Sequence, residues 1–190
     1  MMPLTRSLCY AALALGLLFP SIASAQSCSS RGQLDEAYCD ADGDLVADVP
    51  AKTRDPSVIV FAYTPVEDPA VYENAFRPFT EYLGKCTGKR VVYYPVQSNS
   101  AEIEAMRSGR LTVAGFSTGP VGFAVNMAGA VPFAAKGTEK GVEGYNLIVI
   151  VKASSPYQKL SDLKGKKLAH TAPSSNSGNL APKALFPEQG

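Results

Sequence analysis

Residues 58–63 read VIVFAY, a continuous apolar run rich in β-branched and aromatic side chains. A short run of this kind is typical of a strand that is buried on both faces of a parallel sheet. A polar loop follows at 64–69. Apolar side chains then recur at helical spacing over 70–83, and Gly84 is expected to end that helix. Strand, loop and helix in this order predict the first unit of an α/β fold.

The same order of elements repeats along the chain. Further strands are predicted at 90–96, 111–116, 131–135, 144–151 and 167–169. Helices are predicted at 101–108, 121–127, 160–166 and from 180 onward, the first of them capped by Ser98, Asn99 and Ser100. Alternating strands and helices predict an α/β chain with a mostly parallel sheet.

Polar loops follow three of the predicted strands. They contain Tyr63 and Thr64, Ser117 and Thr118, and the run HTAPSSNS at 170–177. Ligands of open parallel sheets bind beyond the carboxyl ends of the strands. The third loop also leads into a helix, whose first N–H groups lack partners and favour negative charge. The three loops together predict a site for a small anionic or polar ligand; for the third loop alone, a capped turn without a ligand is the alternative.

Composition excludes several classes of function. The 190 residues carry 18 basic and 17 acidic side chains, a net charge of +1, which argues against a nucleic-acid partner. No P-loop or G-x-S-x-G motif is present, which argues against an enzyme. The only histidine, His170, lies among scattered carboxylates that form no recognisable metal-ligand set. We therefore expect no enzyme activity, no cofactor and no metal; a hydrolase using a serine with His170 is the disfavoured alternative.

The N-terminus has the pattern of a signal peptide. Arg6 precedes an apolar run at 8–22, and Ala23-Ser24-Ala25 is a small-residue cleavage site, so we expect cleavage after Ala25 and export. Export implies an oxidising compartment. Cys28 and Cys39 lie close together in a polar segment, and we predict a disulfide between them. Cys86 is then left over, either buried and inert or paired with a partner outside this chain. A catalytic cysteine is the disfavoured third alternative, since the only histidine is far away in sequence.

Residues 26–56 are polar, show no sustained periodicity and are predicted to form an extended N-terminal arm. Within the arm, DADGD at 40–44 resembles the start of a calcium loop. The glycine and glutamate expected at positions 6 and 12 of such a loop are replaced by Leu45 and Ala51. A solvated acidic turn is therefore favoured over a calcium site.

Most of the chain, from about residue 58 onward, resembles a known family. DLKGK at 162–166 and SNSG at 175–178 resemble the "DLKGK … STSG" signature of periplasmic binding proteins for phosphonate and phosphite, which serve ABC importers. The resemblance runs from about residue 58 to 190. It includes IEAMRSG at 103–109 and Tyr145.

The resemblance implies a type II periplasmic-binding architecture, with two α/β lobes joined by crossing strands. Lobe 1 would cover 57–151 and lobe 2 would begin at 152 and be incomplete, so the isolated chain is expected to be poorly stable. The family implies a small phosphorus oxyanion as ligand, an ABC importer permease as partner, and a monomer. An exported sensor or structural binding protein is the alternative.

The family's binding groups can be carried over residue by residue. Hydroxyls and backbone amides at helix N-termini hold the phosphonate oxygens in this family. The matching positions are Tyr63, Thr64, Ser117, Thr118, Ser175, Asn176, Ser177 and Gly178, with His170 as a further candidate. Two departures bear on the ligand: His170 stands where the family often has an aromatic residue, and a common loop tyrosine is replaced at 98–100.

Overall fold

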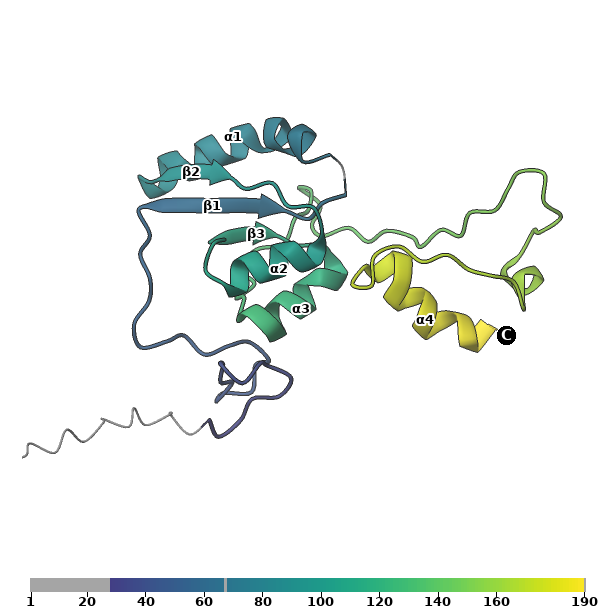
Figure 1. Ribbon diagram of the computed structural model, residues 1–190, viewed down its shortest axis with the longest axis horizontal. Coiled ribbons are helices and arrows are strands. Elements are labelled where there is room, and N and C mark those ends of the chain that lie inside the picture. Colours follow the sequence, from purple (N-terminus) through teal and green to yellow (C-terminus); the bar gives the residue numbers. More distant parts are fainter. Residues whose placement is uncertain (1–27, 67, 190) are drawn as a thin grey trace, which may run out of the picture.

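The centre of the fold is a three-stranded parallel sheet. The computed structural model describes residues 28–66 and 68–189, so the predicted signal segment lies outside the described residues. The strands are β1 (Val58–Tyr63), β2 (Arg90–Tyr93) and β3 (Val113–Gly115). β1 pairs in parallel with both neighbours, in the order β2-β1-β3 (Figure 1). The predicted α/β class with a parallel sheet is confirmed, although β2 and β3 are shorter than predicted.

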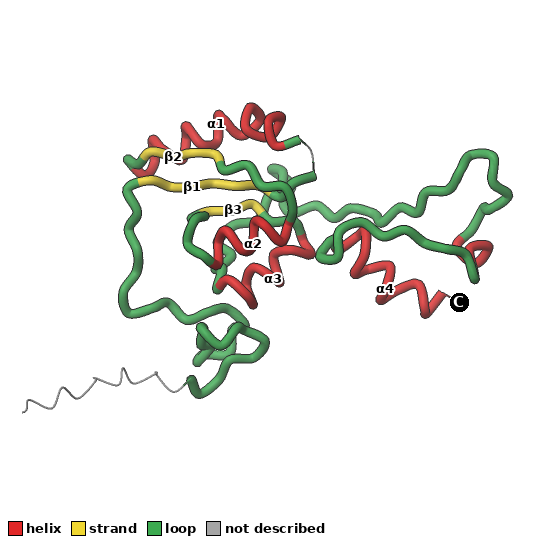
Figure 2. The backbone as a smooth tube through the Cα atoms, in the orientation of Figure 1, coloured by secondary structure: helices red, strands yellow, loops and turns green. Residues whose placement is uncertain are grey.

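Three helices cover this sheet, namely α1 (Pro69–Thr87), α2 (Asn99–Arg107) and α3 (Thr118–Ala128). Neighbouring residues of a strand face opposite sides of the sheet. Accordingly Phe61 packs on Phe76 of α1, and Ala62 clusters with Ala105 of α2. α1 therefore covers one face, while α2 covers the other with α3 beside it (Figure 2). We call residues 58–128 the sheet unit.

Local signals explain where these helices begin and end. Ser98 caps α2 as predicted, because its side chain accepts from the N–H of Ala101 at 3.1 Å. The predicted end of α1 at Gly84 is wrong. The helix runs on to Gly88, whose φ of +68° takes the left-handed conformation that suits a helix end. Gly84 instead lies close to the carbonyl oxygen of Lys89, where a Cβ would be 3.1 Å away.

Beyond the sheet unit, the described chain is mostly irregular. The strands predicted at 131–135, 144–151 and 167–169 do not form, and the helix predicted at 160–166 is a single 3₁₀ turn. The regular elements here are that turn (Leu160–Leu163), a π turn (Asn176–Leu180), α4 (Ala181–Leu185) and a final 3₁₀ turn (Phe186–Gln189). A strand needs a partner strand for its backbone groups, and none pairs with 144–151 in the described residues. Ile148 and Ile150 are consequently exposed.

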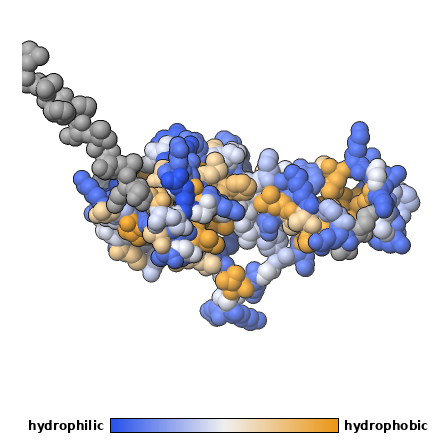
Figure 3. All heavy atoms as spheres, turned by 90° about the horizontal axis from the view of Figure 1, so that it is seen from below, coloured by the Kyte–Doolittle hydropathy of each residue, from blue (hydrophilic) through white to orange (hydrophobic). Residues whose placement is uncertain are grey.

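The irregular part has an apolar groove of about 690 Å³. Its walls are mainly aliphatic: Leu147, Val149, Val151, Leu160, Leu163, Leu168, Pro182 and Phe186. Apolar surface is visible here as well as over the sheet unit (Figure 3). Four lysines also line it, namely Lys152, Lys164, Lys166 and Lys167, together with His170, Thr171 and Ser177. The groove therefore combines an uncovered apolar face with positive charge and hydroxyl groups.

The N-terminal arm folds back on the sheet unit, and the prediction of an extended arm is wrong. Leu34 is buried, and the N–H of Asp35 donates to the carbonyl of Asn126 at 2.7 Å. Arg107 of α2 pairs with Asp35 at 3.4 Å. The arm thus packs across α2 and the end of α3. Among the described residues, no helix is both long and apolar enough to cross a membrane.

Cys28 and Cys39 face each other within the arm as a disulfide, with their Cα atoms 5.5 Å apart. Cys86 is exposed on α1. Alkylation of the native protein without reductant, followed by peptide mass mapping, is expected to label Cys86 and leave Cys28 and Cys39 joined in one cross-linked peptide pair. Labelling of all three cysteines would contradict the pairing.

Candidate functional site

The carboxyl ends of β1 and β3 meet through Thr64. Its N–H donates to the carbonyl of Gly115 at 2.9 Å, and its side chain is buried. The Thr64 hydroxyl accepts from the N–H of Ser117 at 3.4 Å. The strand-end residues that the sequence singled out therefore do come together in space.

The start of α3 offers unused donors at the same point. Ser117 occupies the N-cap position, yet its side chain forms no capping hydrogen bond. The first hydrogen bond of this helix runs from the N–H of Val121 to the carbonyl of Ser117. The N–H groups of Thr118 and Gly119 precede that bond and lie at the positive end of the helix dipole. This arrangement can accept an anion.

The serine-rich loop at 174–178 lies directly against the start of α3. A Cβ on Gly119 would overlap the carbonyl oxygen of Ser174 and lie 2.7 Å from the nitrogen of Asn176. Asn99 of α2 donates from Nδ2 to the hydroxyl of Ser174 at 3.1 Å. Gly119 is thus a close-approach glycine, and two polar helix starts share one edge of the sheet unit.

The loop itself is held by its own hydrogen bonds. The Ser175 hydroxyl accepts from the N–H of Gly178 at 3.2 Å, which starts the π turn. Asn179 is buried and donates to the carbonyl of Pro173 at 2.6 Å. The loop is therefore ordered by internal contacts before any ligand is considered.

Tyr145 brings a further hydroxyl to this region from the irregular segment. Its hydroxyl lies 3.1 Å from that of Thr118. Hydrogen bonding lowers the pKa of Tyr145, with Thr118 contributing most, followed by Ser177 and then Asn176. Residues of α3 and of the serine loop therefore share one tyrosine.

Two predicted residues lie at the margins of this group. The hydroxyl of Tyr63 accepts from Lys136 Nζ at 2.8 Å, and Lys136 also lies 5.3 Å from the centre of the Tyr63 ring. His170 is exposed and shares the wall of the apolar groove with Ser177 and Gly178. His170 is thus on the serine-loop side of the region rather than at the strand ends.

Glu102 is a site neighbour that the sequence analysis missed. It lies in α2 with an exposed fraction of 0%. Burial raises the pKa of its carboxyl to about 8, and the Thr64 hydroxyl partly opposes this shift. Asn99 and Lys136 were also missed, whereas Ser174 belongs to the serine run at 170–177 that the sequence singled out. The polar run at 98–100, which caps α2 and replaces a loop tyrosine common in the family, was the available signal for Asn99.

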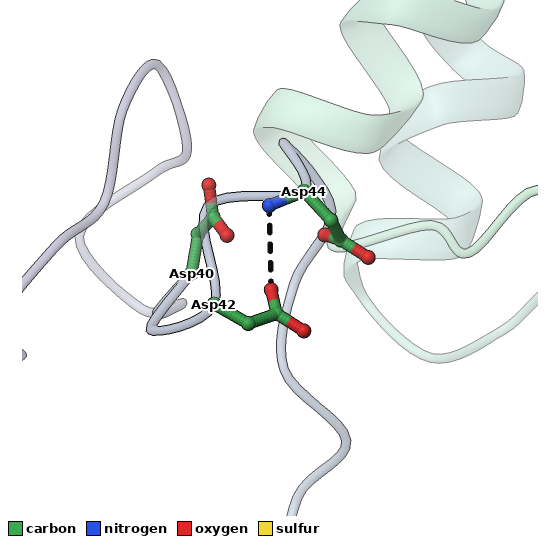
Figure 4. A group of neighbouring side chains, drawn as sticks. All are labelled: Asp40, Asp42 and Asp44. Carbon is green, nitrogen blue, oxygen red and sulfur yellow. Dashed lines mark hydrogen bonds between the residues drawn. The ribbon is translucent and has the colours of Figure 1, made fainter.

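The acidic turn of the arm is a separate group (Figure 4). Carboxylate oxygens of Asp40, Asp42 and Asp44 lie within 4.8 Å of one another. Asp40 is buried, and it accepts from the N–H of Gly43 at 2.8 Å and of Leu45 at 3.1 Å. The backbone thus already satisfies the innermost carboxylate. Asp42 and Asp44 are exposed, as expected for a solvated turn.

Comparison with known proteins is consistent with this geometry. The sequence profile of a family described as the periplasmic substrate-binding protein of phosphonate ABC transporters matches residues 61–190. This chain belongs to that family. The match begins within β1 and covers the rest of the sheet unit and the serine loop. The family comprises substrate-binding proteins of transporters rather than a class of enzymes, and its members are periplasmic.

A curated relative is the phosphate-import protein PhnD of Mycolicibacterium smegmatis. It is 30% identical to this chain over 140 residues, which is 71% of this chain and 43% of the relative. The chain therefore matches less than half of that protein's length.

Proposed function

We propose that this chain captures a small phosphorus oxyanion, such as a phosphonate, phosphite or phosphate, for an ABC importer. The observation that supports this most is the meeting of two helix starts at Gly119, where the donors of Ser117 and Thr118 adjoin the serine loop. Hydroxyl and N–H groups bind a charged oxygen through short, charge-assisted hydrogen bonds. The name of the relative favours the same ligand class.

Binding would close two lobes around the ligand. We assign lobe 1 to 57–151 and the start of lobe 2 to 152–190, with a hinge near Val151. In this proposal Thr64, Ser117 and Thr118 donate from lobe 1, and Ser175, Ser177 and the amides of the serine loop donate from lobe 2. Lys136, held beside Tyr63, supplies a positive charge near the rim.

The same proposal covers export and partners. The protein would be exported with cleavage after Ala25, act as a monomer, and deliver its ligand to the permease of the importer. It would bind no nucleic acid and need no cofactor.

Calorimetric titration of the full-length protein tests the proposed function. The ligands are phosphate, phosphite, methylphosphonate and 2-aminoethylphosphonate, with sulfate as the control for binding of any oxyanion. Tight binding of one phosphorus compound and weak binding of sulfate is the expected result. Absence of binding to all four phosphorus compounds would contradict the proposal.

Replacing Ser117 or Ser177 by alanine is expected to weaken binding of the preferred ligand by about 1–3 kcal/mol, or roughly 5- to 150-fold, because a donor to a charged oxygen is removed. The measurement is the same titration. Ser161→Ala is the matched control, since Ser161 is exposed on the 3₁₀ turn after the predicted hinge. Unchanged affinity in both Ser117→Ala and Ser177→Ala would contradict the assignment of the site.

A further inference from the structure

Glu102 is a buried carboxyl without a charge partner in the described residues. Its side chain is fully buried, and neither carboxyl oxygen forms a hydrogen bond of good geometry. The ion pairs of the described chain involve Lys89 and Arg107, and neither reaches Glu102. An ionised carboxylate in such a place is strongly unfavourable, so the neutral form is favoured.

The elements around Glu102 offer little to stabilise its charge. β1, β3 and α3 contain no acidic or basic side chain other than Tyr63. From β2, Tyr93 lies beside Phe61, which packs on α1. Burial raises the pKa of Tyr93, and the charge of Glu102 adds to that shift. On α2 itself, Glu104 and Arg107 are paired with each other. The polar group that acts directly on Glu102 is the hydroxyl of Thr64.

Thr64 begins a chain of hydrogen bonds that leaves the core and reaches the serine loop. Its hydroxyl donates to Asn99 Oδ1 at 3.2 Å, and Asn99 Nδ2 donates to the hydroxyl of Ser174 at 3.1 Å. A hydroxyl has one proton to donate. A neutral Glu102 leaves that proton free to point outward. An ionised Glu102 accepts it, and the outward bond from Thr64 is lost.

We propose that Glu102 is a positioning residue whose protonation state sets the direction in which the Thr64 hydroxyl donates. Anion binding is thereby coupled to the uptake or retention of one proton by Glu102. The inference rests on the proposed function, because Thr64 is one of the proposed ligand donors. A neutral Glu102 keeps Thr64 available to Asn99 or to an anion, and it also spares the anion a nearby negative charge.

The buried environment of Glu102 places the change in its protonation within an experimentally accessible pH range. Burial raises the pKa of Glu102 to about 8, so the carboxyl is mainly neutral at pH 7 and mainly ionised at mildly alkaline pH. A bound anion disfavours the ionised form further. Affinity for an anion should therefore decline as the pH rises past this value.

The test compares three full-length proteins by calorimetric titration with inorganic phosphate, from one pH unit below to one pH unit above the pKa near 8. They are the wild type, Glu102→Gln, which is permanently neutral, and Glu104→Gln on the exposed side of the same helix. The titration of phosphate itself is common to all three proteins and cancels in the ratio of their dissociation constants.

The dissociation constant of the wild type is expected to rise relative to that of Glu102→Gln, approaching about tenfold per pH unit above the pKa of Glu102. Glu104→Gln should follow the wild type. Parallel pH profiles for the wild type and Glu102→Gln would overturn the inference. Failure of the wild type to bind phosphate or another phosphorus oxyanion at any pH would instead count against the proposed function.

A measurement on the wild type alone tests the inference if the Glu102→Gln protein does not fold. Infrared difference spectra of the ligand-free protein should show the band of a protonated carboxylic acid at neutral pH, and this band should disappear as the pH passes about 8. Absence of a protonated carboxyl at neutral pH would overturn the inference.

Discussion

Replacing Phe61 by alanine is expected to lower the free energy of unfolding by about 3–5 kcal/mol, the usual effect of deleting a large buried aromatic side chain. Phe61 lies in the central strand and is 3% exposed. Its ring centre lies 5.4 Å from that of Phe76, 5.0 Å from that of Phe79 and 6.1 Å from that of Tyr93. One substitution therefore removes ring contacts from β1 to α1 and to β2.

Urea denaturation of the full-length protein measures this loss. Phe133→Ala is the matched control, since Phe133 is 80% exposed and its removal should change stability by less than about 0.5 kcal/mol. The result also distinguishes a core role for Phe61 from a role in the wall of the ligand cleft. If Phe61 is a core residue, the Phe61→Ala protein is less stable, but its folded form keeps its affinity for methylphosphonate. If Phe61 lined the ligand cleft, the Phe61→Ala protein would lose affinity with little change in stability. That outcome would contradict the assignment of Phe61 to the core.

The sheet unit was predictable because its signals are local. The apolar run of β1, the serine cap of α2 and the spacing of apolar residues along α1 each depend on neighbours in sequence. The boundaries were less predictable. Gly84 looked like a helix end, but its lack of a side chain serves the close approach to Lys89 instead.

The strand predicted at 144–151 shows that a strand-like sequence pattern does not by itself predict whether a strand forms. Its composition suits a buried strand, but a strand forms only when another strand takes up its hydrogen bonds. The described chain supplies no such neighbour, and Ile150 is left 87% exposed. The same reason accounts for the missing strand at 131–135.

The grouping of the polar strand-end residues was predictable, but not the rest of the polar cluster around them. Thr64 and Ser117 were placed together because the carboxyl ends of parallel strands meet at one edge of the sheet. The contact between Gly119 and Ser174 could not be predicted, since it joins residues far apart in sequence. Glu102 was missed for a related reason. A glutamate in a short polar helix is expected to face water, and only the packing of α2 against the sheet reveals its burial.

Because Glu102 is buried, the free energy of unfolding is also expected to depend on pH. The pKa of its carboxyl is about 8 in the folded protein, against a reference value of 4.5 that represents the unfolded chain. Between these two values the folded protein retains a proton that the unfolded chain has released. Raising the pH through this range therefore favours unfolding, and the loss is complete once the pH exceeds the folded pKa.

The free energy of unfolding of the wild type should thus contain a term that falls by up to about 1.4 kcal/mol per pH unit across this window, or roughly 3–5 kcal/mol in total. Urea titrations at a series of pH values measure it. Glu102→Gln has no proton to lose and should lack this term, so the difference in stability between the two proteins should change steadily with pH in favour of the variant.

Glu104→Gln provides the comparison that isolates burial as the cause. Glu104 lies two residues away on the exposed side of α2, and its loss should leave the slope between about pH 4.5 and 8 unchanged. If the wild type and Glu102→Gln show the same slope, Glu102 titrates near its ordinary pKa in the folded protein. The carboxyl would then be ionised at neutral pH, and neither the stability term nor the proposed control of Thr64 could operate.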